Sequence, residues 1–265
     1  MTLLAQAAWI LAFASLLMVV LWELQRRLKD AALVDAGWAL ALGASAVFVA
    51  ASGTGHPLNR LLIAVLGGLW GLRLGLHLLH DRVLSTAGED GRYQAMRRAM
   101  GSRAQLGFFG FFQLQAAAVA VLAMPFALVA ANPVWSWPLA IAAITLWLVS
   151  IIGEAVADRQ LADFRKDPAM RGQVCQIGLW RYSRHPNYFF EWLHWWAYAV
   201  VAAGNPAWWG WLGFAAPPLM LVLLLKVSGI PFTEQQALRS RGAAYARYQR
   251  TTSAFFPWFP RPEAP

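Results

Sequence analysis

The chain has 265 residues and a net charge of +9, and 59% of its residues are hydrophobic while only 13% are charged. A soluble domain usually carries about 25% charged residues, so this composition argues against a soluble protein and indicates a membrane protein. The basic residues stand in short clusters between apolar runs, which is the pattern of membrane topology; we therefore expect no nucleic-acid partner. Cys175 is the single cysteine, which excludes an internal disulfide.

Seven apolar segments follow one another along the chain, each about long enough for a bilayer crossing of roughly 20 residues. The first is not expected to be a signal peptide, because its basic residues follow the apolar run instead of preceding it. We predict an all-α fold: a polytopic membrane helical bundle with about seven transmembrane helices and a short cytoplasmic C-terminal helix, in a single integral membrane domain, 1–265. The approximate spans are 4–25, 31–52, 59–81, 106–131, 134–157, 187–204 and 206–230.

The charge distribution predicts the orientation of these spans. With the N-terminus outside, the outer connections are 53–58, 132–133 and 205, and Arg60 is the only one of the 22 Lys and Arg residues that lies beside them. This positive-inside bias places the C-terminus in the cytoplasm. The inner connections are then 26–30, 82–105, 158–186 and the C-terminal tail.

The second and third spans contain small and ionisable residues. Gly67, Gly71 and Gly75 repeat every four residues, which predicts a face that a neighbouring helix approaches closely. Charged groups are costly inside a membrane, so Arg73 and Asp35 either form a structural ion pair or line a substrate cavity with the histidines of the third span. His77 and His80 lack a third metal ligand at a suitable spacing, and we predict no metal site.

Polar residues gather where the sixth span begins, in RYSRHPNYFFEW at 181–192. Pro186 suits the first turn of a helix, and the free N–H groups of that turn attract anions. Asn187 and Glu191 lie one turn apart on one face, and arginine forks match phosphate well. This combination favours a site for a large anionic cofactor over ordinary positive-inside flanking.

The fifth span ends in a second set of polar residues. Glu154 and Asp158 are one turn apart, and Arg165 follows two turns later. They are either a helix-end salt-bridge set or, if the fifth and sixth spans pack side by side, part of the same cofactor site.

The chain after the seventh span predicts a surface helix. Pro231 is expected to end the span, and Thr233 with Gln236 to form a capping box for the next helix. The arginines that follow would lie at the cytoplasmic surface, where they either bind anionic lipid headgroups or contribute to the cofactor site. These are Arg239, Arg241, Arg247 and Arg250.

The segments GLWRYSRHPNYFFEW and AAYARYQRTTSAFFPWFP resemble the C-terminal domain of the steroid 5-alpha-reductase family, most closely its bacterial membrane branch. Sterol reductases and isoprenylcysteine carboxyl methyltransferases are similar over the same RHPxY and Tyr-x-x-Tyr…Pro elements. The resemblance covers about 150–260. It implies a location in the bacterial inner (cytoplasmic) membrane and NADPH as cofactor, bound by the region 133–265. The implied cofactor contacts are Asp158, Arg165, Tyr182, Arg184, His185, Asn187, Glu191, Tyr245 and Tyr248.

The same resemblance implies the chemistry. Hydride would pass from NADPH to the β-carbon of a C=C–C=O group, while a proton donor polarises the carbonyl. The steroid enzymes use a Glu and a Tyr in the N-terminal half, and no such pair aligns here; Asp35, His77 and Tyr93, on the substrate side (1–132), are our candidates for catalysis. The predicted partners are a lipophilic small molecule (a steroid, an unsaturated acyl chain or an isoprenoid) and membrane lipids, with no obligate protein partner.

Two alternatives belong to other functional classes. A methyltransferase that uses S-adenosylmethionine shares the RHP and tail-tyrosine elements, although Glu234 of the tail has no neighbouring acid here, where such enzymes usually show a Glu-Glu pair. A cofactor-free transporter or membrane scaffold would bind no nucleotide and would tolerate loss of Asn187. Binding of NADPH against S-adenosylmethionine discriminates among these readings.

Overall fold

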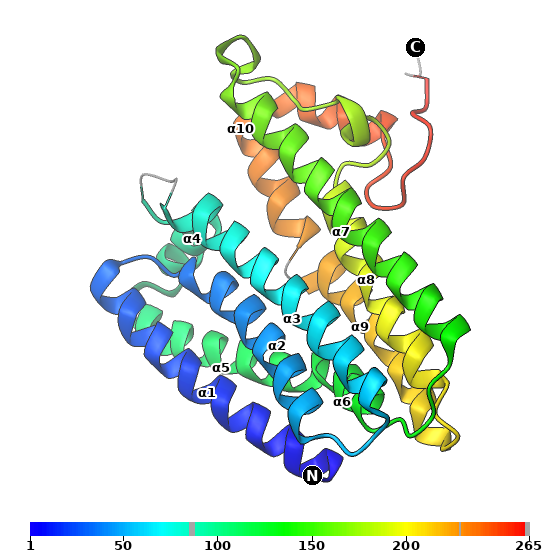
Figure 1. The fold of residues 1–265 in the computed structure, drawn as a ribbon. Coiled ribbons are helices and arrows are strands. Elements are labelled where there is room, and N and C mark those ends of the chain that lie inside the picture. Colours follow the sequence, from blue (N-terminus) through cyan, green and yellow to red (C-terminus); the bar gives the residue numbers. More distant parts are fainter. Residues whose placement is uncertain (85–87, 228, 263–265) are drawn as a thin grey trace. The chain divides into compact units, whose positions relative to one another are not determined.

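The computed structural model describes residues 1–84, 88–227 and 229–262. The predicted inner connection 82–105, the seventh span 206–230 and the C-terminal tail therefore each include residues outside the described ones. The described chain is helical throughout and contains no strand, so the all-α prediction is confirmed (Figure 1). It forms two compact units, Met1–Ala140 with Tyr198–Gly213, and Ile141–Ala197 with Phe214–Pro265.

The first unit is built from a run of helices that follow the predicted spans. The predicted fourth span, 106–131, is divided between two helices, with Pro125 in the first turn of the second. A π-helical turn, His80–Leu84, continues the third helix. The helices are α1 (Leu3–Leu28), α2 (Leu33–Ser52), α3 (Pro57–Leu79), α4 (Gly91–Met100), α5 (Ala104–Leu122) and α6 (Met124–Ala130).

The glycine face of α3 packs against α2, as its spacing predicts. A Cβ atom on Gly71 would lie 2.5 Å from the Cα atom of Gly43, so the two backbones touch at this point. A Cβ atom on Gly67 would lie 2.5 Å from Ala46 Cβ, and one on Gly75 would lie 2.6 Å from Leu40 Cγ. The stripe therefore serves packing.

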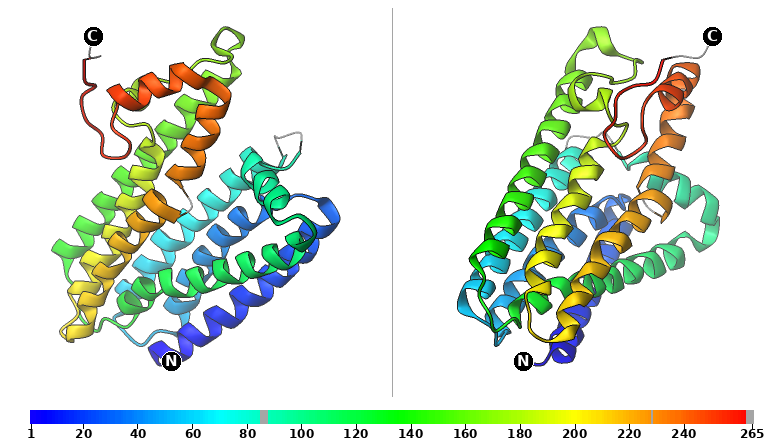
Figure 2. Two further views of the ribbon diagram at one scale, coloured as in Figure 1. Left: turned by 180° about the vertical axis from the view of Figure 1, so that it is seen from behind. Right: turned by 90° about the vertical axis from the view of Figure 1, so that its right-hand side faces the viewer.

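The second unit contains α7 (Trp137–Lys166, from residue 141), the first two-thirds of α8 (Pro186–Ala203), α9 (Ala216–Val222) and α10 (Ile230–Thr251). The predicted capping box is wrong: α10 begins at Ile230 after Gly229, with Pro231 in its first turn, and Thr233 Oγ1 donates to the Gly229 carbonyl at 3.1 Å. Pro231 begins a helix here because its missing N–H costs nothing in a first turn. Figure 2 shows the bend within α10, where Gly242 adopts a positive φ of 51°.

Six helical stretches of the described residues are long and apolar enough to cross a membrane. The remaining predicted span corresponds to α8, which has 18 residues. Large apolar side chains such as Trp9, Leu16 and Leu106 are exposed on these helices, as expected for surfaces that face lipid. The protein is an integral membrane protein. The six stretches are Leu3–Leu28, Leu33–Ser52, Pro57–Leu84, Gly91–Ala130, Trp137–Lys166 and Trp208–Thr251.

Candidate functional site

The polar residues of α7 and α8 meet in the second unit, as they would if the fifth and sixth spans packed side by side. Asn187 Nδ2 donates to Asp158 Oδ1 at 3.3 Å. The helices come close because Gly153 has no side chain: a Cβ there would lie 2.4 Å from the Phe190 ring. Glu154 is buried one turn before Asp158, and Glu191 follows Asn187 by one turn on α8. We call Glu154, Asp158, Asn187 and Glu191 the polar seam.

The first turn of α8 already has partners for part of its backbone. Ser183 Oγ accepts from the His185 N–H at 3.1 Å and donates to the Phe255 carbonyl at 2.8 Å. Asn187 Oδ1 accepts from the Tyr188 N–H at 3.0 Å. The amide of Asn187 thus orders the start of α8 and contacts α7 at the same time.

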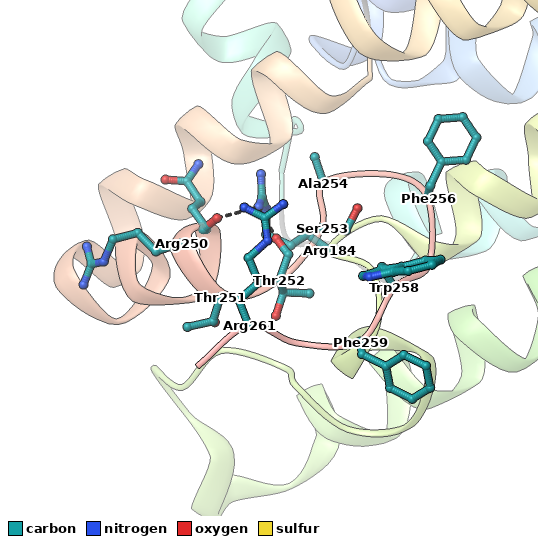
Figure 3. Close-up of a pocket in the computed structure, with 11 residues that line it drawn as sticks. Arg184, Arg250, Thr251, Thr252, Ser253, Ala254, Phe256, Trp258, Phe259 and Arg261 are labelled. Atoms are coloured by element: carbon teal, nitrogen blue, oxygen red, sulfur yellow. Dashed lines mark hydrogen bonds between the residues drawn. The ribbon is translucent and has the colours of Figure 1, made fainter. Parts of the chain in front are cut away.

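Arg184 is buried, which the sequence did not anticipate. Its Nε donates to Glu234 Oε1 at 2.6 Å, and one terminal nitrogen donates to the carbonyls of Gln249 and Thr252 at 2.9 and 2.5 Å. Figure 3 shows the guanidinium beside the backbone that follows α10. We call this ion pair the Arg184–Glu234 clasp. It joins the loop before α8 to α10 and the tail.

Glu234 also contacts two further residues. Gln249 Nε2 donates to its second oxygen at 2.8 Å, and His185 Nε2 lies 3.3 Å from Oε1. Burial lowers the pKa of His185, the Arg184 charge lowers it further, and the hydrogen bond to Glu234 opposes both without reversing the shift. His185 is therefore neutral at pH 7, and its ring stacks on Tyr188 with the centroids 5.5 Å apart. Sequence reasoning used Glu234 only to count acidic residues in the tail.

The predicted cofactor tyrosines hold the tail and the loop before α8 together. Tyr248 is buried, and its hydroxyl donates to the carbonyls of Trp180 and Ser183. Tyr245 is also buried and packs edge-on against Tyr248. The Tyr182 carbonyl accepts from the Trp258 N–H at 2.9 Å. The side chains of Tyr245 and Tyr248 thus have a structural role, whereas the bond at Tyr182 involves only its backbone.

Arg165 is exposed in the last turn of α7. The 3-10 turn before α8, Gly178–Arg181, lies against the same part of that helix, because the Leu179 N–H donates to Gln160 Oε1 at 2.9 Å. Arg181 in this turn is also exposed. Two exposed arginines thus lie at the end of the second unit that carries Asp158 and Asn187.

Two of the three predicted catalytic residues meet in the first unit. The Tyr93 hydroxyl donates to Asp35 Oδ1 at 2.7 Å. Tyr93 was expected on a loop but lies buried in α4. The sequence suggested Arg73 as the partner of Asp35; instead the second carboxylate oxygen is bound by Arg82 and, at 2.8 Å, by Arg92.

Asp90 supports this cluster from the N-cap of α4. Its Oδ1 accepts from the backbone N–H of Arg92 at 2.9 Å and from Nε of the same residue at 3.1 Å. Burial alone would raise the pKa of Asp90, but the Arg92 charge and hydrogen bonds outweigh it and lower the pKa. Arg82 and Arg92 bind the same carboxylate oxygen of Asp35, so this oxygen has two cationic partners. The third predicted catalytic residue, His77, is half-buried on α3.

Comparison with known proteins adds a family. Residues 21–252 match the family described as "Protein of unknown function (DUF1295)". The chain belongs to this family. The match includes both the polar seam and the Asp35 cluster, so both lie within the family's own extent. No curated protein and no solved structure matches the chain.

Proposed function

We propose that this membrane protein is an NADPH-dependent reductase of a C=C bond conjugated to a carbonyl, acting on a lipophilic steroid-like or lipid substrate in a bacterial inner membrane. The observation that carries the proposal is the polar seam. A hydrogen-bonded Asp158–Asn187 pair joins α7 and α8, and Asn187 belongs to the RHPNY motif that resembles the steroid 5-alpha-reductase family.

The donor set of the seam fits one half of such a cofactor. Carboxylate and amide groups can bind ribose hydroxyls and a nicotinamide carboxamide, since each such group needs both donors and acceptors. The phosphates need cations, and Arg184 is already paired with Glu234. We assign that role to the exposed Arg165 and Arg181. Arg184, predicted to contact the cofactor directly, then acts by positioning the start of α8.

We assign tasks to the site residues as follows. Asn187 and Asp158 orient the ribose and the carboxamide, and Glu191 extends their row along α8. NADPH, when bound, supplies the hydride for the β-carbon. Tyr93 remains our predicted group for polarising the substrate carbonyl; in the first unit its hydroxyl donates to Asp35 Oδ1.

The test is cofactor binding by the purified full-length chain in lipid nanodiscs. We expect NADPH to bind and Asn187→Ala to weaken it about fivefold to thirtyfold, because the substitution removes hydrogen bonds worth about 1–2 kcal/mol. Gln235→Ala is the matched control: it removes an exposed amide from α10 of the same unit and should leave the affinity unchanged.

Three outcomes would overturn the proposal. Binding of S-adenosylmethionine alone would identify a methyltransferase. No binding of either cofactor would favour a transporter or scaffold. Equal NADPH affinity in Asn187→Ala and the parent chain would remove the seam from the site.

A further inference from the structure

The C-terminal tail folds back beside the end of α10 and encloses a cavity of about 520 Å³ within the second unit (Figure 3). Two backbone hydrogen bonds hold the tail there: the Arg261 N–H donates to the Thr251 carbonyl at 2.8 Å, and the Trp258 N–H donates to the Tyr182 carbonyl at 2.9 Å. The cavity is therefore a built feature of the tail.

Its lining combines cations with exposed aromatic rings. Arg184, Arg250 and Arg261 contribute to it, and the residues that line it among the described ones include no acid. Arg184 pairs with Glu234. The side chains of Arg250 and Arg261 are exposed. In Figure 3 the rings of Phe256, Trp258 and Phe259 lie together along one stretch of the tail, apart from the arginines.

The exposure of these rings is the second observation. Phe256, Trp258 and Phe259 are 51%, 70% and 74% exposed, which is unfavourable for three neighbouring large rings in water. Exposed tryptophan rings are typical of the membrane–water interface, where they lie at headgroup depth. The guanidinium fork matches the geometry of a phosphate. A free phosphate would make no use of the rings.

We propose that this cavity binds the headgroup of an anionic phospholipid of the bilayer. Arg250 and Arg261 would bind the phosphate, and Phe256, Trp258 and Phe259 would pack against the glycerol and the upper acyl chains. The tail would then anchor the protein at the membrane interface and bind anionic lipids in preference to neutral ones. This inference does not depend on the reductase activity.

The experiment is native mass spectrometry of the full-length chain in detergent, titrated with phosphatidylglycerol or phosphatidylcholine. We expect phosphatidylglycerol to be retained preferentially, and Arg250→Gln/Arg261→Gln to lower its affinity about thirtyfold, given the contribution of each basic residue at an anionic surface. Arg159→Gln/Arg171→Gln removes the same charge from two exposed arginines outside the cavity and should retain the lipid. Trp258→Ala should weaken retention as well.

Other results would overturn this inference. Equal losses in the two arginine pairs would mean nonspecific attraction to charge. Displacement of the lipid by inorganic phosphate at equal concentration would mean a simple anion site. Displacement by NADPH would make the cavity part of the nucleotide site. Absence of NADPH binding would refute the reductase proposal and leave the lipid result standing, so the two failures are distinguishable.

Discussion

Glu234 connects α10 to the loop before α8 within the second unit. Its two carboxylate oxygens receive Arg184 and Gln249, and His185 lies 3.3 Å away. A buried ion pair is costly to break, because the remaining charge has no partner. Glu234 is therefore explained by the fold. Its presence, or the lack of a neighbouring glutamate, says less about cofactor choice than the sequence suggested.

The buried imidazole of His185 predicts a pH dependence of stability. Burial holds its pKa below 6.5 in the folded chain, while the unfolded chain binds the proton near pH 6.5. The unfolded state thus binds more protons as the pH falls, so the stability present above about pH 6.5 is progressively lost below it. We expect the melting temperature in detergent to fall between pH 7 and pH 5, and to fall less in His185→Gln. Parallel profiles for the two proteins would contradict a buried, neutral His185.

At the scale of the helices, the contact of α2 with α3 depends on the absence of side chains. All three atoms nearest to a Cβ on Gly71 belong to backbone, at 2.5–2.7 Å, and backbone cannot turn aside as a flexible side chain can. Helices in lipid gain association energy from such close packing. Any side chain on Gly71 must therefore separate the two helices.

Gly71→Ala should destabilise the protein by about 1–3 kcal/mol, the usual cost of overpacking. The measurement is the melting temperature of the purified protein, with Gly110→Ala as the matched control. Gly110 also lies in a helix, but a Cβ there would have no atom within 4 Å. That control should be neutral or slightly stabilising because alanine favours helix. A Gly71→Ala protein as stable as its parent would show that the helices can part without cost.

These elements show what local pattern can predict. Hydropathy acts along the chain, so the apolar runs located most of the helices, although α7 continues to Lys166 beyond the predicted end at 157. The four-residue glycine repeat located a packing face. The meeting of Asp158 with Asn187 was predicted only on the condition that the fifth and sixth spans pack side by side, which the sequence left open. The Arg184–Glu234 clasp joins residues 50 apart, and the Asp35–Arg92 pair joins residues 57 apart. Such pairs leave no periodic signal, so they were missed.

At the scale of the whole molecule, one basic residue departs from the positive-inside bias, and the structure explains its position. Arg60 is the only basic residue beside a predicted outer connection. Its guanidinium donates to the carbonyls of Ala50 at 2.6 Å and Ala51 at 3.1 Å. These carbonyls lie in the last turn of α2, where helix carbonyls lack partners and the dipole favours a cation. Arg60 thus caps a helix, and the positive-inside argument stands without it.

The predicted topology can be tested with introduced cysteines, because the one cysteine of the parent chain should give only weak background labelling. Cys175 is 7% exposed, and burial raises the pKa of its thiol, so little of the reactive thiolate is present at neutral pH. Thr54→Cys and Ser102→Cys place exposed thiols near opposite ends of α2 in the first unit. With the N-terminus outside, a membrane-impermeant maleimide should label Thr54→Cys in intact cells and Ser102→Cys only in inside-out vesicles. The reverse pattern would invert the topology and move the polar seam out of reach of cytoplasmic NADPH.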